Sequence, residues 1–262
     1  MQKVTYLQNS LNKGVLIRWP DHCFPLKFYI APFKWYASKG DDYKYRQMVI
    51  DALNLWQSAT SGQVSFEIVN VLHESQINLD WRRVDRKSLG HCNYNFDNQG
   101  RLYSAEVQIG LSDGVLHSRY MDGNEVMHTI IHEIGHALGL GHSPNKSDIM
   151  YTPHQYGVTS ISQADVMSLI WLYRLPWGTP PNEIAAKYGI ASSDIDDVIA
   201  KLTNEKHKSE FEKVKDNIKV EEKNLLEEQA RIAELKKYTV LALQDVKLPK
   251  DVYNYIKKPP LK

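Results

Sequence analysis

The 262-residue sequence has few cysteines, no excess of one charge and no long hydrophobic run. Its two cysteines, Cys23 and Cys92, exclude a disulfide framework, although a single bridge stays open if the fold brings them together. Lysine plus arginine (32) nearly balances aspartate plus glutamate (31), which argues against binding to nucleic acid or to an anionic membrane. No segment has the apolar length of a signal-peptide core or a membrane span, so we expect a cytoplasmic location by default.

What the sequence does contain is the composition and patterning of a globular α+β domain. Hydrophobic residues make up 42% of the chain and aromatic residues 10%, enough for a substantial core. Helical spacing of apolar residues predicts three main helices, and compact or alternating apolar stretches predict five strands. The expected helices are 41–62, 124–140 and 162–175, and the expected strands are 24–31, 63–69, 76–82, 90–96 and 104–111.

The composition changes after Pro181, where we expect a charged helical extension over residues 182–262. Residues 203–238, which we expect to form a long solvated helix, carry nine positive and nine negative side chains, with a heptad-like but interrupted apolar stripe. The interruptions favour packing on the protein's own surface, or a weak hairpin, over a stable coiled-coil dimer. The same segment is our candidate for binding a protein partner.

The stretch HEIGHALGLGHS, residues 132–143, holds three histidines and one glutamate in an otherwise amphipathic helical pattern. Residues four apart lie on the same face of a helix, so His132 and His136 point in the same direction. Glu133 is the next residue after His132 around the helix axis, so its side chain lies beside an ion held by the two imidazoles and does not bind it directly. Gly139 lets the chain turn, which brings His142 back as a third nitrogen ligand and leaves a fourth position for water.

This pattern predicts a catalytic zinc site with His132, His136 and His142 as ligands. Water on such an ion has its pKa lowered to about 7, and Glu133 would take its proton and pass it to the leaving amine. The competing interpretation is that the histidines are satisfied polar residues of a buried helix. It is disfavoured because five residues of fixed type fall at the offsets of H-E-x-x-H-x-x-G-x-x-H.

The same stretch resembles the metzincin metalloproteases and, within them, the matrixins. Metzincins follow the histidine motif with a methionine turn beneath the metal, and Met150 in SDIMY fits that turn. Ser143 follows the third histidine, as in the matrix metalloproteinases and their bacterial relatives, and we place the chain with the bacterial type. In ISQADVMSLIWLY, Asp165 matches the second aspartate of a matrixin pair, which supports the methionine turn. Ala164 replaces the first, which can hold the processed N-terminal ammonium.

The resemblance covers roughly residues 15–178 and is most specific over 124–173. It implies a metzincin catalytic domain, with a twisted and mostly parallel sheet, an antiparallel edge strand and three main helices. Retention of Asp165 without its neighbour implies that the turn support is kept and that the N-terminal activation device is absent. The family is mostly secreted, in contrast to the default cytoplasmic expectation.

The resemblance also bears on cofactors. One catalytic zinc ion is expected, and the resemblance leaves room for a structural calcium ion. Matrixins commonly hold a second zinc in the strand region, and His91 resembles one of its ligands. VQIGLSD offers no histidine where another should stand, so we do not expect a second zinc and interpret His91 as a plain strand residue. Cys23, in a Pro-x-x-Cys context, is interpreted as a buried or loop thiol, with a regulatory role on the zinc as the alternative.

The expected activity is hydrolysis of internal peptide bonds in a peptide or protein bound in extended form. By resemblance, the substrate pairs with an edge strand at 89–96, beside a specificity pocket walled by the loop after Met150, including Pro153 and Tyr156. Two alternatives stay open: a catalytically weak zinc-binding protein that acts through its helical extension, and a zinc amidase or peptidase acting on cell-wall peptides. The intact Glu133 argues against the first.

Overall fold

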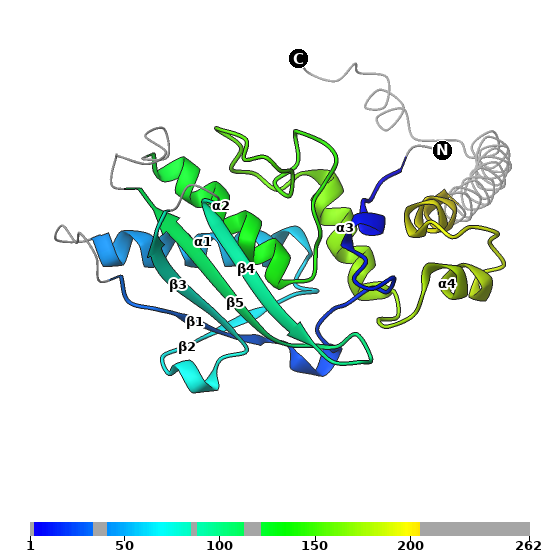
Figure 1. Ribbon diagram of the computed structural model, residues 1–262, viewed down its shortest axis with the longest axis horizontal. Helices are drawn as coiled ribbons and strands as arrows, with labels where there is room; N and C mark the ends of the chain where they lie inside the picture. Colours follow the sequence, from blue (N-terminus) through cyan, green and yellow to red (C-terminus); the bar gives the residue numbers. More distant parts are fainter. Residues whose placement is uncertain (1–2, 34–40, 85–87, 113–121, 205–262) are drawn as a thin grey trace, which may run out of the picture. The chain divides into compact units, whose positions relative to one another are not determined.

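The computed structural model describes residues 3–33, 41–84, 88–112 and 122–204 (Figure 1). The chain separates into two compact units, Met1–Thr203 and Asn204–Lys262. All the elements described below belong to the first unit. The expected long helix over 203–238 lies, apart from its first two residues, outside the described residues.

A single five-stranded sheet forms one layer of this unit, with strand order β2-β1-β3-β5-β4 (Figure 1). All neighbouring strands are parallel except β4, which runs antiparallel to β5 at one edge. This confirms the predicted α+β fold with a mostly parallel sheet and an antiparallel edge. The strands are β1 (Leu26–Ile30), β2 (Phe66–Val69), β3 (Ile77–Arg83), β4 (Gly90–Phe96) and β5 (Leu102–Leu111).

Alternation along the strands decides which face of the sheet is covered. In β3, the apolar residues Ile77, Leu79 and Trp81 are buried, whereas the residues between them are more exposed. Successive strand side chains point to opposite faces, so these three lie on one side of the sheet. That side faces the core of the domain.

Helices cover this buried face (Figure 1). α1 packs against α2, and α2 lies along β4 and β5. Two buried indoles fix the layer by donating to helix carbonyls: Trp56 Nε1 to Ile131 at 3.0 Å, and Trp19 Nε1 to Ala137 at 2.8 Å. The helices are α1 (Asp41–Ala59), α2 (Gly123–Ala137), α3 (Gln163–Arg174) and α4 (Pro181–Lys187). The three predicted main helices are thus present, and Ser162 caps α3 as part of a capping box.

The compact unit includes residues on both sides of the expected 15–178 domain. At the N-terminal side, Tyr6 and Leu7 are buried in the same core. At the other end, residues 195–204 are helical, and Ile195, Val198 and Ile199 are buried as well. These apolar side chains belong to the same core cluster, and the packed unit runs to residue 203.

No helix in the described part of the chain is both long and apolar enough to cross a bilayer. This observation does not by itself support the expected cytoplasmic location.

Candidate metal centre

Two of the three histidines come from the last turns of α2. Asp122 caps the start of this helix by accepting a hydrogen bond from Asn124 N. His132 and His136 lie one turn apart on the same face, with ring centroids 4.7 Å apart. The helix thus supplies two imidazoles to one point, as the spacing of four residues predicts.

A sharp helix end brings the third histidine to the same point. Gly139 has φ +99°, its N–H bonds His136 O, and the N–H of Leu140 bonds Gly135 O at 3.0 Å. This is the left-handed glycine ending of a Schellman motif. A Cβ at Gly139 would lie 2.7 Å from Ile17 O, so both conformation and space require glycine. α2 therefore ends at Ala137, before the predicted residue 140, and the chain returns so that His142 faces the helix.

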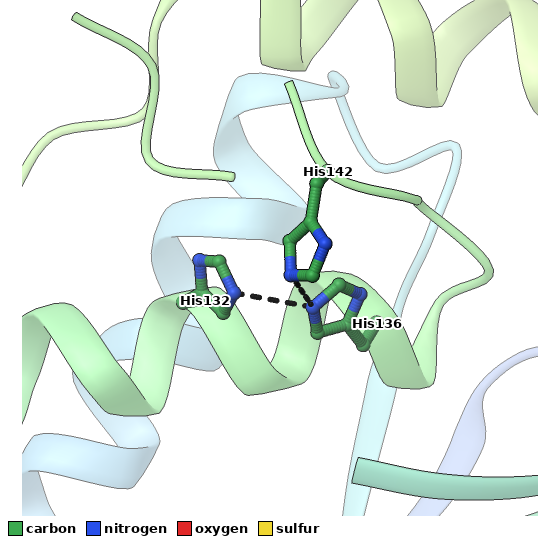
Figure 2. A group of neighbouring side chains, drawn as sticks. All are labelled: His132, His136 and His142. Atoms are coloured by element: carbon green, nitrogen blue, oxygen red, sulfur yellow. Dashed lines mark hydrogen bonds between the residues drawn. The ribbon is translucent and has the colours of Figure 1, made fainter. Parts of the chain in front are cut away.

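The three Nε2 atoms converge (Figure 2). His136 Nε2 lies 3.1 Å from His132 Nε2 and 3.2 Å from His142 Nε2, and the three donor atoms lie within 4.8 Å of one another. Nitrogen ligands at about 2.05 Å from a tetrahedral ion stand about 3.3 Å apart. The spacing therefore fits a zinc-sized cation. Among the described residues, these three histidines are the group of side chains found to be placed to bind a metal ion.

Hydrogen bonds at the far side of two rings fix the chemical form of the donors. His132 Nδ1 lies 2.7 Å from Ile149 O, and His136 Nδ1 lies 2.8 Å from Leu140 O. A carbonyl only accepts, so each Nδ1 carries the proton and each Nε2 presents a lone pair. Two lone pairs facing each other at 3.1 Å repel unless a cation lies between them. The donor set thus fits a metal ion.

Burial keeps these imidazoles neutral. It lowers the pKa of His136 to about 4, although its bond to the Leu140 carbonyl acts in the opposite direction. The pKa of His132 is held well below its usual value, mainly by burial and secondly by the positive charge that His136 would carry. Burial also lowers the pKa of His142. Because metal binding needs unprotonated imidazole, the histidines are ready to bind at neutral pH.

Glu133 lies beside the histidines and is 6% exposed. Burial raises its pKa to about 8, and the positive charge of Arg82 opposes this shift only in part. A carboxyl group whose pKa lies near neutrality is suited to taking up and giving back a proton. Gly90, at the start of β4, makes room for it: a Cβ there would lie 2.7 Å from both Cγ and Oε1 of Glu133.

Replacing Gly90 with alanine is therefore expected to displace Glu133. Misplacement of a catalytic group by about 1 Å can cost about 100-fold in rate, so we expect kcat on a peptide substrate to fall 10- to 100-fold. Asn95→Ala, a change of an exposed side chain on the same strand, serves as the control and should leave kcat within about twofold. Equal kcat for the Gly90→Ala variant and the wild-type protein would show that this contact does not position the carboxylate.

Beneath the histidines, the chain folds back in a tight turn around Met150. The N–H of Ser143 donates to Met150 O at 2.9 Å, and Ser143 Oγ donates to Asp148 Oδ2 at 2.5 Å. Met150 is fully buried against α2 at Gly135, where an added Cβ would lie 2.3 Å from its sulfur. Gly135 thus allows the turn to approach the helix that carries the first two histidines.

Asp165 holds this turn from the other side. It is fully buried, and its Oδ2 accepts the N–H groups of Ile149 and Ser162, each at 2.9 Å. The carbonyl of the same Ile149 accepts the bond from His132 Nδ1. The carboxylate therefore acts on the first histidine through the backbone of a single residue, Ile149.

Comparison with known proteins agrees with this geometry. Residues 19–174, more than half of the chain, match the model of the Matrixin family. The chain belongs to the matrixin family. It is 30% identical over 148 residues to a probable matrix metalloproteinase, 095L, of Invertebrate iridescent virus 3, covering 51% of this chain and 38% of that protein. It is also 30% identical over 90 residues to matrix metalloproteinase-A of Caenorhabditis elegans, covering 33% of this chain and 16% of that protein. The chain thus spans well under half the length of these relatives.

In this matrixin a cleft of about 730 Å³ opens over the histidines and Glu133. One wall is β4, the edge strand that the sequence places there. Another wall is the loop after Met150, and Pro153 and Tyr156 both line the cleft as expected.

The sequence interpretation missed a polar cluster in the same wall. Glu125 is buried, with Oε2 2.5 Å from His154 Nε2 and Oε1 accepting the N–H of Gly157 at 2.9 Å. His128 packs against His154 with ring centroids 4.1 Å apart, and its Nδ1 lies 2.6 Å from Val158 O. The spacing of four between His128 and His132 was a usable signal, because it places both on one helix face. The members of the cluster in the loop after Met150, which are His154, Gly157 and Val158, could not be identified from a spacing in the sequence.

The remaining sequence-predicted residues lie apart from the histidine cluster or play no evident part in it. Both cysteines are free thiols. Cys92 lines the cleft, and burial, together with the charge of Glu133, raises its pKa. Cys23 lies in a 3₁₀ turn before β1. His91 also lines the cleft, and its Nε2 lies 2.8 Å from Asn93 Oδ1.

Proposed function

We propose that this matrixin is a zinc-dependent endopeptidase in which His132, His136 and His142 bind the metal and Glu133 is the general base. The observation that supports this most strongly is the convergence of three Nε2 lone pairs beside a buried carboxyl group at the bottom of an open cleft. Zinc bound there supplies Lewis acidity and lowers the pKa of water. Met150 and Asp165 support the site from below.

The chain's own residues carry the proton. Glu133 takes a proton from the attacking water and delivers it to the amine that leaves when the peptide bond breaks. Burial of the carboxyl group favours its neutral form, which eases the first transfer, and Arg82 limits the shift. Neutral His132 and His136 keep their protons on Nδ1, bound to backbone carbonyls, so they take no part in this transfer.

The substrate is a peptide or protein bound in extended form against β4. Within the described residues, β4 pairs with β5 along one edge, and its other edge borders the cleft. A peptide added there continues the ladder through its backbone, and its side chains alternate between the cleft and solvent. The loop containing Pro153 and Tyr156 would then contact the side chain just beyond the cleaved bond.

The first test is metal analysis with a peptidase assay on the full chain. We expect one zinc per chain and cleavage of an unstructured protein at internal bonds, lost on treatment with a chelator and restored by zinc. A folded, pure protein that takes up no zinc would refute the proposal. Zinc binding without cleavage of any library peptide would instead favour a role as a zinc-binding protein.

Zinc binding is also expected to release a proton from Glu133. Its pKa of about 8 in the metal-free site means that it is mostly protonated at pH 7, whereas a neighbouring cation favours the carboxylate. The histidines, with lowered pKa values, have no proton to release. Calorimetry in buffers of different ionisation enthalpy should show about one more proton released at pH 7 than for Glu133→Gln. The difference should shrink as the pH rises through 8, and its absence at pH 7 would contradict the raised pKa.

A further inference from the structure

The N-terminal residues 3–10, which we call the strap, lie between two parts of the domain that are far apart in sequence. On one side is the helical segment 195–204, and on the other are α3 and the loop that carries His142. Residues 5, 6, 7 and 10 of the strap are buried. The contacts on each side explain why it is held there.

Asp196 anchors the strap. Its side chain is 3% exposed, and its two oxygens accept three hydrogen bonds from the strap. Oδ1 accepts Thr5 Oγ1 at 2.6 Å and Leu7 N at 2.7 Å, and Oδ2 accepts Gln8 N at 3.1 Å. Gln8 returns a bond, because its Oε1 accepts the N–H of Ile195 at 3.0 Å. A buried carboxylate with three donors from one segment fixes the position of that segment.

On its other side, the strap contacts the supports of two metal ligands. Tyr6 Oη donates to Asp165 Oδ1 at 2.7 Å, and that aspartate holds Ile149, the partner of His132. Asn9 Nδ2 donates to the carbonyl of His142 at 3.1 Å.

The contact next to His142 is close as well as polar. The N–H of Gly141 donates to Ser10 Oγ at 2.8 Å. A Cβ at Gly141 would lie 2.2 Å from Asn9 O, so the strap and this loop touch backbone to backbone. Motion of the strap away from the domain would release both the Gly141 N–H and the His142 carbonyl, on the two sides of the third histidine.

We infer that the strap and the segment 195–204 together form a brace for the metal centre, in which Asp196 and Tyr6 are positioning residues for His132 and His142. This inference rests on the proposed function for its consequence in catalysis. Its structural content, restraint of residues 139–151, holds whether or not the metal is bound. Two segments outside the expected 15–178 domain are thereby parts of the site.

The test compares Asp196→Ala and Tyr6→Phe with Lys3→Ala in the full chain. Lys3 is a matched control, because it joins the strap to Asp197 of the same segment, and to the adjacent Asp194, through exposed ion pairs. Amide hydrogen exchange of the metal-free proteins is measured at 25 °C, where each is folded. Loss of a net hydrogen bond changes an equilibrium by about three- to tenfold. We expect exchange over residues 139–151 to be at least about threefold faster for the first two variants and unchanged for the control.

A second measurement follows release of zinc to a chromogenic chelator. Zinc should leave Asp196→Ala and Tyr6→Phe at least about threefold faster than it leaves the wild-type protein or Lys3→Ala, and Asp196→Asn, which keeps one acceptor oxygen, should fall between. If exchange speeds up only within residues 3–10 and 195–204, the strap is merely structural and the inference is overturned. A wild-type protein that binds no zinc refutes the proposed function, while the exchange result still decides the brace.

Discussion

Replacing Glu133 with glutamine is expected to lower kcat for peptide hydrolysis by about 10³-fold while leaving zinc bound. General acid–base catalysis contributes about 10²- to 10⁴-fold, and an amide of the same shape cannot accept the proton. The three histidines and the carbonyls that orient two of them are untouched, so metal content should stay at one per chain. The measurements are steady-state kinetics and metal analysis on the same preparation.

The matched control is His142→Ala, which removes a ligand and should lose both zinc and activity. His142 is the most exposed of the three histidines, so this truncation should perturb the core least. The two variants thus separate loss of the base from loss of the metal. A Glu133→Gln protein with more than a tenth of wild-type kcat would assign the proton transfer to another group.

Asp165→Ala is expected to cause the largest loss of stability, about 4 kcal/mol in the free energy of unfolding. The fully buried carboxylate accepts from Tyr6 Oη, Ile149 N and Ser162 N, and its removal leaves three donors without a partner. Each unsatisfied buried donor costs about 1–3 kcal/mol, less where water enters the space left behind. Urea denaturation of the metal-free protein, with unchanged slope, measures the difference.

Two further variants serve as comparisons for this loss of stability. Asp165→Asn keeps one acceptor oxygen and should lose less stability than the alanine variant. Asp51→Ala removes an exposed aspartate of α1 and should change stability by less than about 0.5 kcal/mol. A loss below about 1 kcal/mol for Asp165→Ala would mean that the turn around Met150 is held by its packing against Gly135 alone.

The parts of the site that follow from local chain geometry were predictable. His132 and His136 are related by the helical repeat, and the left-handed turn at Gly139 returns His142 within six residues of His136. The alternation of apolar residues in β3 and the helical repeat of α2 likewise indicated the types of these two elements. In each case the sequence pattern and the structure that it predicts involve residues close together in the sequence.

The parts that join distant segments were not predictable. Nothing near Gly90 signals that Glu133 will lie against it, and Asp196 carries no local sign of its bonds to the strap. Similarly, Glu125 looks like an ordinary first-turn acid of α2, although it holds the loop at Gly157. These pairings depend on how elements dock, and one sequence contains no periodicity that reports it.

Within the described residues, β4 pairs with another strand along one edge only, and this has a consequence for solubility. An unpaired strand edge is a template for association with another chain, and proteins usually bury it or shield it. A groove that takes up extended peptides has to leave it accessible. Here His91, Asn93 and Asn95 are the exposed side chains of the strand, so its solvent side is polar. Polar side chains leave the backbone free for a bound peptide yet disfavour stable edge-to-edge assembly into aggregates, since two such strands would gain little buried apolar area.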